Sequence, residues 1–131
     1  MYKVLIVEDE DLICKGLRYN YEWNKLDCVV IGEENNGKDG LKAIREFRPD
    51  IVITDIRMPL MSGLEMIQEA SEEYDFSSII ISGYDEFELA KKAIQLGVCE
   101  YLIKPLDYDQ LDLALQRAKT WLEARRNYER N

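Results

Sequence analysis

The alternation of short, wholly apolar runs with longer stretches of helical periodicity constrains this chain more than any other feature. The apolar runs cover residues 4–7, 28–31, 51–54, 79–81 and 101–103. Runs that are apolar throughout, rather than at every second position, are typical of parallel strands covered by helices on both faces. Between them, apolar residues recur at helical spacing over about residues 11–21, 38–47, 62–72 and 86–96, and again from Tyr108 onward.

This order, strand then helix five times over, predicts a three-layer α/β fold around a five-stranded parallel sheet. If the first and third strands are neighbours, the strand order is 2-1-3-4-5, as in flavodoxin-like folds. Helix boundaries agree with this interpretation, because three segments resemble capping boxes and Gly97 marks a helix end. The capping boxes are Ser62-x-x-Glu65, Asp85-x-x-Glu88 and Asp107-x-x-Gln110.

Length and composition limit the classes of protein to consider. The 131 residues are about enough for one domain. No apolar run reaches about 18 residues and no signal-peptide pattern is present, which predicts a soluble, cytoplasmic protein without a membrane segment. The net charge of −9 disfavours direct binding of nucleic acid. The three cysteines, Cys14, Cys28 and Cys99, are widely spaced and the chain has no His, so we expect reduced, packed thiols rather than a zinc site.

The last helical segment differs from the rest of the chain. Its apolar stripe consists of Leu111, Leu115, Ala118 and Leu122, whereas residues 117–131 hold five basic and two acidic residues. We therefore expect a domain over residues 1–120. Residues 121–131 are expected to extend the last helix as a linker to an output domain that this chain lacks.

Acidic residues gather where the first and third predicted strands end. The first strand is followed by Glu8-Asp9-Glu10-Asp11 and the third by Asp55. In open α/β sheets the carboxyl ends of neighbouring strands form the binding cleft, so Glu8, Asp9 and Asp55 would share it. Clustered carboxylates need a cation, and oxygen ligands of this kind suit Mg²⁺. The alternative is that they are turn residues and helix caps. We expect Glu10 and Asp11 to cap the first helix or to face solvent.

Two further strand ends add a hydroxyl and a cation. The fourth strand ends at Ser82 and the fifth at Lys104. A serine hydroxyl can donate a hydrogen bond to a phosphoryl oxygen, and an ammonium group can neutralise its charge. Each residue alone is weak support, but together with the acids they supply what an aspartyl phosphate needs. The acidic loop argues against a nucleotide-binding protein, which uses backbone N–H donors at this position.

These motifs together resemble the receiver domain family of two-component response regulators. The resemblance covers about residues 2–120 and lies in Val4–Glu10, Asp50–Pro59, Ser62-Gly63, Ile80–Tyr84 and Tyr101–Pro105. It implies that Asp55 is the phosphoacceptor. It also implies that Mg²⁺ is bound by Asp9, Glu8, Asp55 and the backbone carbonyl of Arg57. Glu8 departs from the family pattern, in which Asp is commoner.

The resemblance also assigns the residues that respond to phosphorylation. Ser82 would be the switch hydroxyl, Lys104 the phosphate-binding lysine, and Tyr101 the switch aromatic, unless Tyr101 is an ordinary strand residue. A cis Lys104-Pro105 bond is implied as well. The family function is to accept a phosphoryl group from a sensor histidine kinase and to switch an output. The protein would then be no enzyme beyond its own phosphorylation and dephosphorylation.

Residues 82–87 and the Arg-rich last helix resemble receivers fused to AraC-type helix-turn-helix transcription factors. In that case DNA would be bound only by an output domain absent from this chain. A stand-alone receiver and an unphosphorylated interaction module on the same fold are the alternatives. A Mg²⁺-dependent phosphohydrolase is disfavoured, because Arg57 stands where such enzymes carry a second acid. A homodimer through the fourth and fifth helices, or through the C-terminal stem, is also compatible with the sequence.

Overall fold

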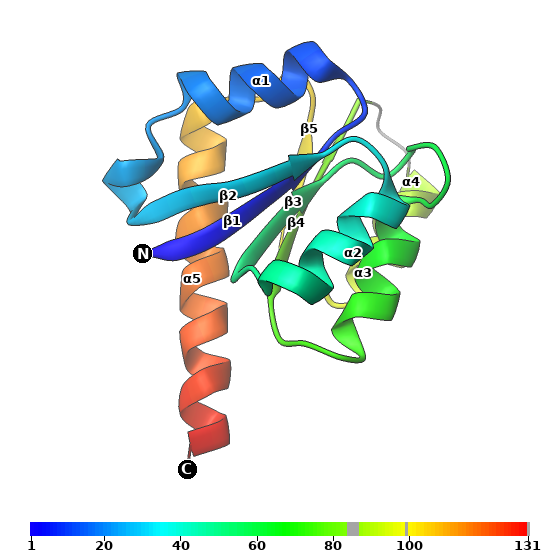
Figure 1. Cartoon of the computed structure of the whole chain (residues 1–131). Helices are drawn as coiled ribbons and strands as arrows, with labels where there is room; N and C mark the ends of the chain where they lie inside the picture. The colour runs from blue at the N-terminus through cyan, green and yellow to red at the C-terminus, as the bar shows by residue number, and fades with distance from the viewer. Residues whose placement is uncertain (84–86, 99, 131) are drawn as a thin grey trace.

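The five strands lie side by side in one parallel sheet, in the order β2-β1-β3-β4-β5. The computed structural model describes residues 1–83, 87–98 and 100–130. The strands are β1 (Tyr2–Val7), β2 (Cys28–Glu34), β3 (Ile51–Thr54), β4 (Ser77–Ser82) and β5 (Glu100–Ile103). Figure 1 shows the sheet and the helices that connect its strands. The fold class and the strand order predicted from the sequence are confirmed.

Five helices cover the two faces of the sheet. They are α1 (Asp11–Asn20), α2 (Gly37–Phe47), α3 (Gly63–Ser71), α4 (Phe87–Gln95) and α5 (Tyr108–Arg130). Successive strand residues point to opposite faces. Val4 and Ile6 accordingly join the core cluster beneath α1 and α5, whereas Leu5 and Val7 join the cluster beneath α2, α3 and α4. No helix within the described ranges is both long and apolar enough to span a membrane.

The element boundaries differ from the predicted ones mainly at strand ends. β1 begins at Tyr2 and β2 continues to Glu34, because partly polar residues extend each ladder beyond its apolar run. A 3₁₀ helix, η1 (Trp23–Leu26), was not predicted. The buried indole of Trp23 holds it in place, since Nε1 donates to the carbonyl oxygens of Leu17 and Arg18, each at 3.2 Å.

The predicted helix caps have different outcomes. Ser62 caps α3 by accepting a hydrogen bond from the Glu65 amide at 3.1 Å, as expected. Glu10 occupies the N-cap position of α1, but its side chain accepts no capping hydrogen bond and is exposed, which was the other expectation for it. Asn36 caps α2, a role that the sequence analysis missed. The capping box at Asp85 and the cysteine Cys99 lie outside the described residues.

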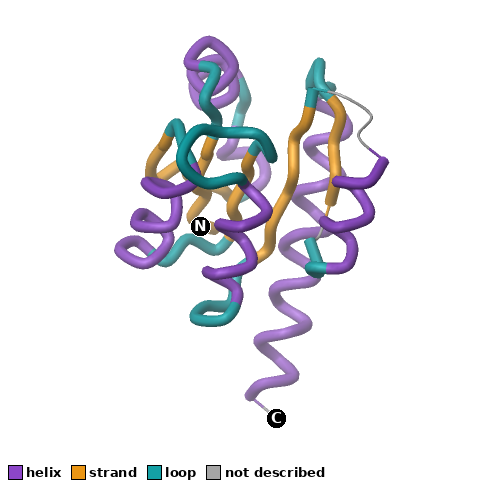
Figure 2. Tube along the Cα trace, turned by 90° about the vertical axis from the view of Figure 1, so that its right-hand side faces the viewer, coloured by secondary structure: helices purple, strands orange, loops and turns teal. Residues whose placement is uncertain are grey.

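The C-terminal helix is long, and its predicted apolar stripe is confirmed. Leu111, Leu115, Ala118 and Leu122 are fully buried against the sheet. Figure 2 shows α5 running past the end of the rest of the chain. Cys14 and Cys28 are buried free thiols in the core beneath it, as expected.

The stripe yields a test of the packing of α5. Leu115 is fully buried, so Leu115→Ala should lower the free energy of unfolding by about 2–5 kcal/mol. Leu113 lies on the same helix but is 51% exposed, so Leu113→Ala should change it by less than about 0.5 kcal/mol. Urea denaturation of the two variants and the parent chain measures both. Equal losses in the two variants would contradict the packing described here.

Candidate functional site

The backbone brings the ends of β1 and β3 together. Val7 pairs with Thr54 in the register of the two strands, and the Asp55 amide donates to the Val7 carbonyl oxygen at 3.1 Å. On the other side, the Glu8 amide donates to the Glu34 carbonyl oxygen of β2 at 2.9 Å. The side chains that follow β1 and β3 therefore meet at one edge of the sheet.

Three carboxylates meet at this edge. Glu8, Asp9 and Asp55 each offer an oxygen atom, and these atoms all lie within 4.8 Å of one another. Glu8 and Asp55 are buried, whereas Asp9 is exposed. Negatively charged oxygen atoms at this spacing form a donor set that suits a hard divalent cation such as Mg²⁺. The acids predicted to share one cleft are thus found together.

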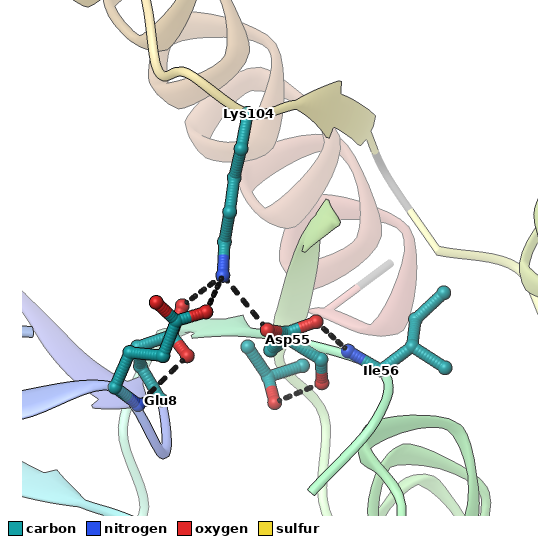
Figure 3. Close-up of polar contacts among 6 residues, drawn as sticks. Glu8, Asp55, Ile56 and Lys104 are labelled. Atoms are coloured by element: carbon teal, nitrogen blue, oxygen red, sulfur yellow. Dashed lines mark hydrogen bonds and ion pairs between the residues drawn. The ribbon is translucent and has the colours of Figure 1, made fainter. Parts of the chain in front are cut away.

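Lys104 reaches this cluster from the end of β5. Its Nζ lies 2.6 Å from Glu8 Oε1, 2.8 Å from Asp55 Oδ2 and 3.6 Å from Glu10 Oε1. Figure 3 shows the ammonium group above the two buried carboxylates. The Lys104 amide donates to the Ser82 carbonyl oxygen at 2.8 Å, which fixes the root of the side chain, and the Lys104-Pro105 peptide bond is cis.

Burial and ion pairing act together on the protonation of these groups. Burial raises the pKa of Glu8 to about 7, although a hydrogen bond from Lys104 opposes the rise. Burial alone would lower the pKa of Lys104. Its hydrogen bonds to Asp55 and Glu8 outweigh that effect and raise the pKa above its usual range. The ion pairs with Asp55 and Glu8 thus favour the charged form of Lys104.

The carboxylate of Asp55 is held in a fixed orientation. Its Oδ1 accepts a hydrogen bond from the Ile56 amide at 2.7 Å, and its Oδ2 faces Lys104. The hydroxyl of Thr54 donates to the Asp55 carbonyl oxygen at 2.8 Å. These backbone and hydroxyl contacts were not foreseen, because the sequence alone does not show the path of the loop that follows β3.

Two glycines allow that loop to pack closely. The Gly63 amide donates to the Ile56 carbonyl oxygen at 2.8 Å, and a Cβ atom at Gly63 would lie 1.9 Å from the Asp55 carbonyl oxygen. The Gly37 amide donates to the Met61 carbonyl oxygen at 3.1 Å, and a Cβ atom at Gly37 would lie 2.1 Å from that oxygen. No side chain fits at either position without moving backbone, that of Asp55 at Gly63 and that of Met61 at Gly37.

The other predicted site residues lie around this cluster. Ser82 is buried at the end of β4 and pairs with Ile103 across the ladder. Tyr101 is half-buried against the core on the α4 side, and its buried hydroxyl has no hydrogen-bond partner among the described residues. Arg57 is exposed in the loop after β3, two residues beyond Asp55.

The structure thus combines a five-stranded 2-1-3-4-5 sheet with an acidic cluster and a lysine at its carboxyl edge. The family model of the response regulator receiver domain matches residues 4–116. The chain belongs to this family. Members of this family typically bind Mg²⁺ and interact with histidine kinases. The acidic cluster of Glu8, Asp9 and Asp55 agrees with a Mg²⁺ site of this kind.

Relatives and solved structures agree with this assignment. The uncharacterized transcriptional regulatory protein YesN of Bacillus subtilis (strain 168) is 40% identical over 117 residues, which are 88% of this chain and 32% of YesN. The transcriptional regulatory protein HptR of Staphylococcus aureus (strain NCTC 8325 / PS 47) is 39% identical over 124 residues, which are 94% of this chain and 49% of HptR. The chain thus spans half or less of the length of these relatives.

Among solved structures, the REC domain of AraT, a response regulator from Geobacillus stearothermophilus, matches with a TM-score of 0.87 at 36% identity. The alignment covers 95% of this chain and 98% of that domain. A response regulator receiver domain protein from Clostridium thermocellum matches with a TM-score of 0.85 at 26% identity, with 95% and 98% covered.

The close packing of the loop at Asp55 can be tested with alanine. Gly63→Ala places a Cβ atom against the Asp55 backbone, so the free energy of unfolding should fall by about 1–3 kcal/mol. Gly16 provides the control, since a Cβ atom there meets nothing closer than 3.8 Å. In mid-helix, Gly16→Ala should raise the free energy of unfolding by about 0.5–1 kcal/mol. Urea denaturation distinguishes the two signs, and a neutral Gly63→Ala would refute the close approach.

Proposed function

We propose that the chain accepts a phosphoryl group on the carboxylate of Asp55 and uses the resulting change to switch an output. One observation carries the proposal: the buried Asp55 carboxylate is oriented by the Ile56 amide and lies 2.8 Å from the Lys104 ammonium group. A carboxylate that becomes an acyl phosphate needs both an orienting donor and a cation for the added charge.

The chemistry is phosphoryl transfer to a carboxylate. An oxygen atom of Asp55 forms a bond to the phosphorus of a phosphohistidine or acyl-phosphate donor, and the bond from phosphorus to the donor atom breaks. The donor leaves as free histidine or as a carboxylate. Lys104 would bind a phosphoryl oxygen, and the Ser82 hydroxyl at the neighbouring strand end would donate to another. In such reactions the protein mainly positions groups and spreads negative charge.

The residues present fit a bound Mg²⁺. Asp9 and Asp55, with Glu8 and the carbonyl group of Arg57, would hold the ion, and oxygen atoms of three of these residues already lie within 4.8 Å of one another. When bound, the ion supplies positive charge that offsets the repulsion between the carboxylates and the incoming phosphoryl group. Asp9, being exposed, is the ligand that solvent and the ion reach most directly.

The switch would run from the site along β4 and β5. A phosphoryl group on Asp55 would draw Ser82 and Lys104 toward it, and these two residues are joined by the hydrogen bond from the Lys104 amide to the Ser82 carbonyl oxygen. Tyr101 lies in β5, and its buried hydroxyl lacks a hydrogen-bond partner among the described residues. A buried hydroxyl without a partner costs free energy, which weakens the preference for the present buried position of the Tyr101 side chain. A small shift at Ser82 could therefore change the preferred position of Tyr101, as a shift between two populations.

For the whole protein we propose a cytoplasmic regulator switched by a sensor histidine kinase. The relatives YesN and HptR are named as transcriptional regulatory proteins, and this chain spans only part of their length. This supports a transcriptional output, whereas the bounds of the receiver (residues 1–120) and of the linker (residues 121–131), and an AraC-type DNA-binding domain, stay predictions. A homodimer, and a stand-alone receiver as the alternative to the fused regulator, stay predictions.

The acceptor residue can be identified by mass. After incubation with acetyl phosphate and Mg²⁺, the intact chain should gain one phosphoryl group, and Asp55→Asn should gain none. Asp27→Asn is the matched control: Asp27 precedes β2 at the opposite end of the sheet, and Asn tolerates its left-handed backbone conformation. An adduct that persists in Asp55→Asn would move the acceptor elsewhere. If the parent chain gains no adduct, binding of beryllofluoride with Mg²⁺ separates a kinase-dependent receiver from an unphosphorylated module.

The metal site can be tested independently of phosphorylation. Asp9→Asn removes one charged ligand, so the affinity for Mg²⁺ should fall by at least about tenfold. Asp11→Asn removes a nearby exposed acid at the start of α1 and should leave the affinity nearly unchanged. Calorimetric titration with Mg²⁺ measures both. Equal affinities for Asp9→Asn and the parent chain would remove Asp9 from the site.

A further inference from the structure

The last part of α5 is held to the body by polar contacts rather than by apolar packing. Leu122 is the last buried side chain of the helix over residues 108–128, where burial is described. The segment that follows, residues 123–130, is here called the stem. None of the side chains of residues 123–128 is buried, and Tyr128 is 83% exposed. Figure 1 shows the helix leaving the body at the end of the molecule opposite α1. An unsupported helix end of this kind would fray.

The central contact joins Arg126 to Asp50. An Arg126 nitrogen lies 2.5 Å from Asp50 Oδ1, and 14% of the Asp50 side chain is exposed. The ion pair is thus partly shielded from solvent. Its partners are 76 positions apart in the chain, so it is a tertiary contact rather than a local one.

Asp50 is an unusually firm anchor. Its Oδ2 accepts a hydrogen bond from the Lys3 amide at 2.7 Å, and its own amide donates to the Lys3 carbonyl oxygen at 2.8 Å. Its carbonyl oxygen accepts from the Ser77 amide at 2.9 Å. Asp50 therefore ties together the beginnings of β1, β3 and β4, and Arg126 is bound to the point where three strands start.

Two flanking contacts act on the same stretch of helix. The Tyr2 hydroxyl donates to Glu123 Oε1 at 2.8 Å, and Arg125 lies 2.7 Å from Asp75 Oδ1. The Arg125 guanidinium group also lies 4.9 Å from the centre of the Trp121 ring, a cation–π contact that restrains it. The stem is thus bound to two sides of the sheet base, through β1 on one side and the α3–β4 loop on the other.

We propose that the Arg126–Asp50 ion pair, with its flanking contacts at Glu123 and Arg125, is an ionic latch that keeps the stem helical. The latch also fixes the direction of the stem relative to the beginning of β3. Whatever follows the stem, or docks on it, is then positioned by the sheet rather than by a flexible tether. This role is separate from phosphorylation, because the latch lies at the start of β3 and Asp55 at its end.

Amide hydrogen exchange on the full chain tests the latch directly. The amides of residues 126–130 donate to carbonyl groups one turn earlier, so their protection reports whether the stem stays helical. In Arg126→Gln and in Asp50→Asn, their protection factors should fall about threefold, the effect of a partly exposed ion pair. Asp50→Asn keeps an oxygen atom that can accept from the Lys3 amide, which preserves the sheet.

Two further variants make the test specific. The double variant Asp50→Asn with Arg126→Gln should lose no more protection than either single variant, because both remove the same contact. Arg117→Gln removes another arginine of α5, whose partner is Glu100 at 3.2 Å, and should leave the stem amides unchanged. Unchanged protection in both single variants would overturn the latch, as would additive losses in the double variant. An equal loss in Arg117→Gln would also overturn it, by showing a general effect of charge.

Discussion

The site depends on the ion pairs that the ammonium group of Lys104 makes with Glu8 and Asp55. Glu8 and Asp55 are buried within reach of each other, and two buried carboxylates without a cation would repel strongly. Lys104 pairs with both at 2.6 and 2.8 Å. With Asp9, three ionised carboxylates and one ammonium group would leave a formal charge of two negative units. That remainder matches a divalent cation, which would offset the negative charge of the phosphoryl group that we propose is transferred to Asp55.

The sheet decides where this chemistry can occur. Helices cover both faces, and both core clusters consist of apolar side chains, so the strand ends are where charged groups can gather. The parallel order brings the ends of β1 and β3 into contact, although Glu8 and Asp55 are 47 positions apart in the sequence. The loop that follows Asp55 then packs closely against this edge of the sheet, because Gly63 has no side chain. The strand order therefore determines where the site lies, and the residue types at the strand ends determine its chemistry.

The sequence predicted the parts of this structure that depend on local patterns. The strand over residues 51–54 and the buried stripe of α5 follow from apolar periodicity. The acids were placed in one cleft on the condition that the first and third strands are neighbours, which the strand order of the sheet confirms. The contacts of Lys104 with Glu8, and of Trp23 with the end of α1, could not be predicted, because they depend on how a side chain crosses between elements. The Asn36 cap was missed because a polar loop surrounds it.

The stem shows how apolar and polar contacts divide the work in α5. Four buried side chains set the rotation of the helix against the sheet, namely Leu111, Leu115, Ala118 and Leu122. Apolar burial of this kind depends little on ionic strength. Beyond Leu122 the contacts are ionic or hydrogen-bonded, and such contacts weaken as salt screens them. The body of the domain and its stem therefore respond to different forces. Because each stem contact is individually weak, the helical state of the stem depends on several such contacts acting together.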